Sequence, residues 1–153
     1  LRRSIALQPS LHESHYTLGI TLMQQGKLDE AIAAFRGAVA AKPDFSQAFY
    51  TLGTALQQTG ELDAAIVAFR TAIQLAPLNP ETHNTLGNAL RQKGDLPAAR
   101  AEFAEAARLN QLKSNHQAAT FDTNTGIQKM KQGNLAAAIN LFESAIKKDE
   151  SYA

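Results

Sequence analysis

The segment Phe49–Gly60, FYTLGTALQQTG, decides the fold of this chain. Leu52 and Leu56 keep the four-residue spacing of one helical face, yet Gly53 interrupts the helix that this spacing predicts. A glycine inside a helix costs about 1 kcal/mol relative to alanine, so it needs a compensating contact. Gly60 closes the segment, where a glycine in the left-handed conformation commonly ends a helix.

The same pattern recurs along the chain with a constant period. The recurring positions are Gly19, Gly53 and Gly87; Gly26, Gly60 and Gly94; Phe35, Phe69 and Phe103; and Pro9, Pro43 and Pro77. Each unit carries one apolar helical face before its second glycine and another after it. The sequence therefore predicts pairs of helices joined at a glycine.

A fourth unit follows with a longer step. The residues Gly126, Gly133 and Phe142 match those of the third unit, but the step to each of them is longer by five. Five extra residues therefore fall around Gln111–Ala118, and Gln111 stands where the repeat has proline. Because no proline or glycine occurs between Ala98 and Thr125, we expect a longer first helix in this unit rather than a loop.

A 34-residue period with Leu-Gly, Ala, Phe and Pro resembles the tetratricopeptide repeat family over nearly the whole chain. The resemblance implies an all-α fold, an α-solenoid of antiparallel helix pairs in a right-handed superhelix whose first helices line a concave groove. The expected division is 1–11 as the end of a preceding repeat, repeats at 12–45, 46–79 and 80–113, an insertion at 114–118 and a repeat at 119–152. Both ends match the interior of a longer array, so head-to-tail self-association through apolar end faces is a further expectation.

The mid-helix glycines then have an architectural explanation. Small residues on both helices of a pair let the two backbones approach closely, with room for the phenylalanine beside them. The expected facing pairs are Gly19 and Ala31, Gly53 and Ala65, and Gly87 and Ala99.

The groove positions are mostly neutral and hydrogen-bonding, and such groups can satisfy the backbone of an extended peptide. Tyrosine and arginine are added because they dominate binding hot spots. The candidate peptide-binding residues are Tyr16, Thr17, Ile20, Tyr50, Thr51, Thr54, Asn84, Thr85, Asn88, Arg91, Asn124 and Lys131.

This groove is similar to the superhelical repeats of O-linked N-acetylglucosamine transferase and to bacterial-type tetratricopeptide proteins. In that transferase the residue before Leu-Gly is typically an asparagine that holds peptide backbone. The matching positions here are Thr17, Thr51, Thr85 and Asn124, so three of the four keep only a hydroxyl. The basic clamp of the family's chaperone-tail binders is absent, and its places hold Tyr16, Ile20, Tyr50 and Asn84.

Composition excludes several other functions. With 19% charged residues and a formal net charge of +1, we expect no nucleic-acid partner, because binding of a phosphate backbone needs clustered lysine and arginine. Lys129, Lys131, Lys147 and Lys148 make the C-terminal end basic, which is usual for a solvated face. The chain has no cysteine for disulfides or thiolate metal sites, and no apolar run of the roughly 18 residues needed for membrane insertion. No nucleophile–base pair, metal set or phosphate loop is present, so we predict no enzyme activity and no cofactor.

His12 and His15 form an H-x-x-H pair, but no carboxylate completes a zinc site. His15, Phe49 and His83 occupy one place in the repeat, which indicates a packing role.

The leading interpretation is a non-enzymatic scaffold that binds a protein or peptide partner in the groove. The alternatives are a substrate-recruiting or regulatory segment of a larger enzyme and a self-associating structural array.

Overall fold

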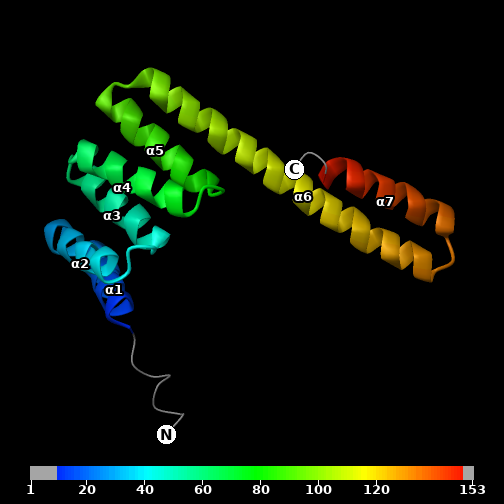
Figure 1. Cartoon of the computed structure of the whole chain (residues 1–153), viewed down its shortest axis with the longest axis horizontal. Coiled ribbons are helices and arrows are strands. Elements are labelled where there is room, and N and C mark those ends of the chain that lie inside the picture. Colours follow the sequence, from blue (N-terminus) through cyan, green and yellow to red (C-terminus); the bar gives the residue numbers. More distant parts are fainter. Residues whose placement is uncertain (1–9, 150–153) are drawn as a thin grey trace, which may run out of the picture. The chain divides into compact units, whose positions relative to one another are not determined.

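The computed structural model describes residues 10–149, which form seven α-helices and no strand (Figure 1). They are α1 (Leu11–Gln24), α2 (Leu28–Ala41), α3 (Ser46–Gln58), α4 (Leu62–Leu75), α5 (Pro80–Lys93), α6 (Leu96–Lys131) and α7 (Leu135–Asp149). The predicted all-α class is confirmed. The repeat boundaries predicted within 1–9 and 150–152 fall outside the described residues.

Local sequence explains where the helices end and begin. Gly26, Gly60, Gly94 and Gly133 follow the first helices of the pairs with φ values of 74°, 85°, 91° and 77°. This left-handed conformation favours glycine and stops each helix, as predicted. Pro80 opens α5, and the Asn79 side chain accepts a 3.0 Å hydrogen bond from the backbone N–H of Glu81.

The described residues divide into two compact units between Ala106 and Ala107, within α6. Unit 1 contains α1 to α5 and the first part of α6, and unit 2 contains the rest of α6 and α7. In unit 1, α1 pairs with α2 and α3 pairs with α4. Each second helix also packs on the next first helix, α2 on α3 and α4 on α5. Phe35, Phe69 and Leu86 are the largest fully buried side chains of the resulting core.

The mid-helix glycines contact a phenylalanine ring. A Cβ atom on Gly53 would lie 2.7 Å from Cδ1 and Cε1 of Phe69, closer than real Cβ contacts come. The same relation holds for Gly19 with Phe35, Gly87 with Phe103, and Gly126 with Phe142. The ring is the neighbour for which the close approach of the two helices was expected to leave room. The glycine therefore makes room for the ring of its own hairpin.

Residues 111–118 are helical, which confirms the preference for helix over loop. The helix is longer than predicted, because α6 begins at Leu96, in the third unit, and continues to Lys131. The reason is the lack of a stop signal, since Gln111 replaces the proline that precedes the next helix elsewhere. Unit 2 is the hairpin that the later part of α6 forms with α7 (Figure 1).

Candidate peptide-binding groove

Two tyrosines on the first helices of unit 1 lie against core aromatic rings. The Tyr16 ring centroid is 5.9 Å from that of Phe35 and 5.0 Å from that of Phe45. Tyr50 repeats the arrangement, with its centroid 6.0 Å from that of Phe69. Both tyrosines are half-buried, so their rings are held in place and only part of each surface faces solvent.

Polar contacts connect neighbouring first helices in this region. The Tyr50 hydroxyl donates to Oε1 of Glu81 at 3.1 Å and lies 3.5 Å from Oγ1 of Thr85. Further along the same helices, Nε2 of Gln57 donates to Oε1 of Gln92 at 2.9 Å. Partial burial raises the pKa of the Tyr50 phenol above its ordinary value, so this group remains a neutral donor at pH 7.

Asn84, Asn88 and Arg91 lie three and four residues apart and therefore share one face of α5. Asn84 and Arg91 are exposed and Asn88 is half-buried. Nη2 of Arg91 donates to Oδ1 of Asn88 at 3.0 Å, and its guanidinium carbon lies 5.9 Å from the Phe103 ring centroid. The ring and the amide together hold the guanidinium over this face.

Three of the candidate threonines use their hydroxyl protons within their own helices. Thr51 is buried and donates to the backbone oxygen of Gln47 at 2.9 Å. Thr54 donates to the oxygen of Tyr50 at 3.0 Å, and Thr85 donates to that of Glu81 at 2.9 Å. At Thr54 and Thr85 the hydroxyl can therefore only accept a hydrogen bond from a ligand. The Thr51 hydroxyl is buried and out of a ligand's reach. Of the other candidates in unit 1, Thr17 is exposed and Ile20 is half-buried.

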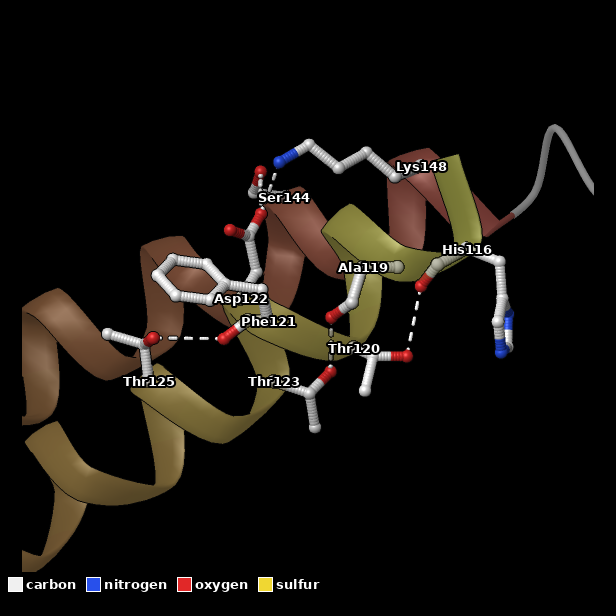
Figure 2. Close-up of polar contacts among 9 residues, drawn as sticks. All are labelled: His116, Ala119, Thr120, Phe121, Asp122, Thr123, Thr125, Ser144 and Lys148. Carbon is white, nitrogen blue, oxygen red and sulfur yellow. Dashed lines mark hydrogen bonds and ion pairs between the residues drawn. The ribbon is translucent and has the colours of Figure 1, made fainter. Parts of the chain in front are cut away.

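Asn124 and Lys131 belong to unit 2, where both are exposed on α6. Asn124 borders a pocket of about 380 Å³ in the α6–α7 hairpin, together with His116, Ala119, Thr120, Thr123, Phe142, Ala145, Ile146 and Asp149. Figure 2 shows the Thr120 and Thr123 hydroxyls bonded back to the carbonyls of His116 and Ala119, each at 2.9 Å. The sequence analysis did not predict this pocket. The feature that could have indicated it is the pair of small residues Ala119 and Thr123, which stand where the first repeat has the larger His12 and Tyr16.

His15 and His83 occupy the same position of the repeat. Both pack against neighbouring residues, as predicted. A Cβ atom on Gly37 would lie 2.9 Å from Nδ1 of His15, so that ring covers the glycine. His83 is buried, and its Nδ1 lies 2.7 Å from Oε2 of Glu102. Within the described part of the chain, no cluster of side chains could hold a metal ion.

In unit 2 the same place holds Asp122, which is buried and paired. It accepts a 2.7 Å bond from the Ser144 hydroxyl and a 2.5 Å bond from Nζ of Lys148 (Figure 2). The bond from Lys148, followed by that from Ser144, lowers the pKa of Asp122. This carboxylate connects the two helices of the hairpin.

Helical hairpins stacked so that each second helix packs on the next first helix define an α-solenoid of repeats. The chain belongs to the tetratricopeptide repeat family, whose model matches residues 1–46, 16–80 and 50–115. Among residues 10–149, none of the helices is long and apolar enough to cross a membrane. No curated protein sequence matches the chain.

Solved structures of the same fold include MamA, which is 23% identical with a TM-score of 0.64, over 97% of this chain and 84% of that one. An engineered MamA variant is 30% identical with a TM-score of 0.62, over 70% of this chain and 78% of that one. The type III secretion translocator chaperone SycD of Yersinia enterocolitica is 26% identical with a TM-score of 0.61, over 64% of this chain and 73% of that one. Membership of the family, together with these neighbours, indicates a protein-interaction scaffold.

Proposed function

We propose that the chain binds an extended segment of a partner protein along the first helices of unit 1, with α5 as the main contact. The observation that carries this proposal is the shared face of Asn84, Asn88 and Arg91. An asparagine amide can donate to one peptide carbonyl and accept from one peptide N–H, as backbone recognition requires. The interaction needs no catalytic group.

The chemistry of this face favours a segment with an acidic side chain opposite Arg91. Its guanidinium already stacks near Phe103 and bonds Asn88, so little side-chain freedom is lost when a carboxylate binds. The nearby Glu81 is engaged by the Tyr50 hydroxyl, so its carboxylate already has a partner within the chain.

The charge of unit 1 supports a protein partner over a nucleic acid. Residues 1–106 carry ten acidic and nine basic side chains, a formal charge of −1. This near-neutral balance provides no excess of lysine and arginine, on which the binding of a phosphate backbone depends. RNA would therefore bind weakly at physiological salt.

A displayed library of extended peptides, screened against the whole chain, tests the proposal. Selected peptides are then titrated by calorimetry against Asn88→Ala and Arg91→Ala variants. We expect each variant to bind at least about tenfold more weakly, because hot-spot truncations commonly cost about 2 kcal/mol or more and about 1.4 kcal/mol is already tenfold.

Arg70→Ala is the matched control, since Arg70 is an exposed arginine on α4, a second helix. It should bind the selected peptides like the wild type. Peptides that bind all three variants equally would show that the binding surface lies elsewhere, and the proposed groove would be rejected.

A further inference from the structure

Unit 2 exposes an apolar face whose counterpart is core in unit 1. Ile139 on α7 is 55% exposed, whereas the residues at its place in the first two repeats, Ile32 and Ile66, are 4% and 5% exposed. Ile146, which borders the pocket described above, is 59% exposed. We call Ile139, Ile146 and the pocket the acceptor face.

The first helix of the chain exposes the complementary side. Leu18 on α1 is 51% exposed, while Leu52 and Leu86 at the same place in α3 and α5 are 7% and 1% exposed. Leu11, at the start of α1, is 69% exposed. We call Leu11 and Leu18 the donor face.

Inside unit 1 these two kinds of face cover each other. The helix pairs α2 with α3 and α4 with α5 bury Ile32, Leu52, Ile66 and Leu86 in one continuous core. This repeat interface therefore supplies, within the chain, the geometry by which a donor face fits an acceptor face.

The pocket of unit 2 matches a slot that an aromatic side chain fills in the first repeat. Phe45 stands at the start of α3. The centroid of its ring lies 5.5 Å from the centroid of the His12 ring, 5.0 Å from that of the Tyr16 ring and 5.5 Å from Nζ of Lys42. When the repeats are aligned, Ala119, Thr123 and Asp149 of the pocket stand at the positions of His12, Tyr16 and Lys42. By the same alignment the place of Phe45 falls in this chain on Tyr152, which lies outside the described residues. Leu11 stands one repeat before Phe45 and so has the corresponding place at the head of α1.

The charges of the two units are opposite. Residues 1–106 carry ten acidic and nine basic side chains, and residues 107–153 carry four acidic and six basic ones. Unit 1 therefore has a formal charge of −1 and unit 2 one of +2. Attraction between them favours an encounter in which unit 1 of one molecule meets unit 2 of another.

We propose that a second copy of this chain covers the acceptor face, with α1 of one molecule packed on the α6–α7 hairpin of the next. Leu11 of one molecule enters the pocket of the next. Leu18 packs on the α6–α7 hairpin of that molecule in the way that Leu52 of α3 packs on α2. The contact continues the repeat interface between molecules. It is heterologous, so each chain offers one donor face and one acceptor face and association can extend beyond two copies.

Size-exclusion chromatography with light scattering tests this on the whole chain over a wide concentration range. The wild type should grow in mass with concentration, and it should do so less at high salt because the opposite charges are screened. Leu18→Asp removes the donor face and Ile139→Asp removes the acceptor face. Each variant alone should associate at least tenfold more weakly, while circular dichroism shows unchanged helix content because both positions are exposed in the single chain.

Mixing the two variants gives the decisive result. Ile139→Asp keeps its donor face and Leu18→Asp keeps its acceptor face, so an equimolar mixture should form a complex of two chains and no larger one. Val67→Asp is the matched control, since Val67 is 64% exposed on α4 but belongs to neither face. It should assemble like the wild type.

Three results would each overturn the proposal: a wild type that stays monomeric up to millimolar concentration, variants that assemble as the wild type does, or a mixture that fails to pair. A monomer whose Ile139 and Ile146 methyl groups are shielded from a dissolved paramagnetic probe would also overturn it. That result would show that a segment of the same chain covers the face.

Discussion

The α3–α4 hairpin of unit 1 and the α6–α7 hairpin of unit 2 are built on the same internal contact. A Cβ atom on Gly53 would lie 2.7 Å from the Phe69 ring, and one on Gly126 would lie 2.6 Å from the Phe142 ring. The spacing along the chain from the glycine to the phenylalanine is identical in the two hairpins. The interior of a hairpin is therefore set by a few residues of that hairpin and does not depend on its position in the array.

The outer faces of the same two hairpins differ. Ile66 on α4 is 5% exposed, but Ile139 on α7 is 55% exposed, and Phe69 is fully buried whereas Phe142 is half-buried. The α3–α4 hairpin has neighbours on both sides, since α2 packs on α3 and α4 packs on α5. Burial, and with it most of the hydrophobic stabilisation, comes from the neighbouring repeats.

The largest expected effect is that of truncating the buried ring. Phe69→Ala should lower the free energy of unfolding of its hairpin by about 3–5 kcal/mol, the usual loss for a fully buried phenylalanine. Phe142→Ala should cost clearly less, because part of that ring is already in water. Native-state hydrogen exchange measures the two hairpins separately. Equal losses would contradict the view that neighbouring repeats supply the difference.

Enlarging the glycine should have a smaller effect and a similar one in both hairpins. Gly53→Leu and Gly126→Leu force new atoms into space held by a ring, and overpacking of this kind costs about 1–3 kcal/mol. Ala33→Leu, at an exposed position of α2, is the control and should change stability by less than about 0.5 kcal/mol. The measurement is the shift of the denaturant midpoint at constant m-value. An unchanged midpoint in Gly53→Leu would remove the packing explanation of the glycine.

The sequence predicted the helical hairpins because their determinants recur in register. The turn glycines, the mid-helix glycines and the phenylalanines each serve one hairpin, so a repeat of constant length is enough to recognise them. The course of α6 was harder, because it depends on the absence of a stop signal around Gln111, and such an absence does not fix where a helix starts.

The candidate groove could be predicted only in part. Helical spacing predicted that Asn84, Asn88 and Arg91 lie on one first helix, and they do lie on α5, since side-chain period is a local property. It could not foresee that Thr51 is buried, or that Tyr50 bonds Glu81 of the next first helix. Those facts depend on how neighbouring hairpins stack. The positions in unit 2, Asn124 among them, belong to a separate compact unit.

The turn glycines test whether the two hairpins are equal in a second local feature. Gly60→Ala and Gly133→Ala place a side chain at φ values of 85° and 77°, where no heavy atom lies within 4 Å of the new Cβ. Only backbone strain remains, so each should cost about 1 kcal/mol, in unit 1 and unit 2 alike. Thermal unfolding followed by circular dichroism measures both. A markedly smaller loss at Gly133 would show that the turn of unit 2 can relax while that of unit 1 cannot.

The smallest expected effect concerns Asp122, whose carboxylate connects α6 and α7. Its pKa is lowered in the folded chain by the bonds from Lys148 and Ser144. The carboxylate therefore contributes stability above its ordinary pKa of about 3.9 and loses it as the pH falls through the lower folded value. Asp122→Asn should melt below the wild type by a constant margin between about pH 5 and pH 8, and the margin should shrink below about pH 4.

Glu143→Gln, which removes an exposed carboxylate from α7, is the control for a change of net charge. It should leave the melting temperature nearly unchanged over the whole range, because exposed ionic interactions contribute little. A margin for Asp122→Asn that persists unchanged at pH 2 would mean that the carboxylate acts there through packing and hydrogen bonding rather than through its charge. The cohesion of unit 2 would then rest on the same kind of close contact that holds the α3–α4 hairpin together.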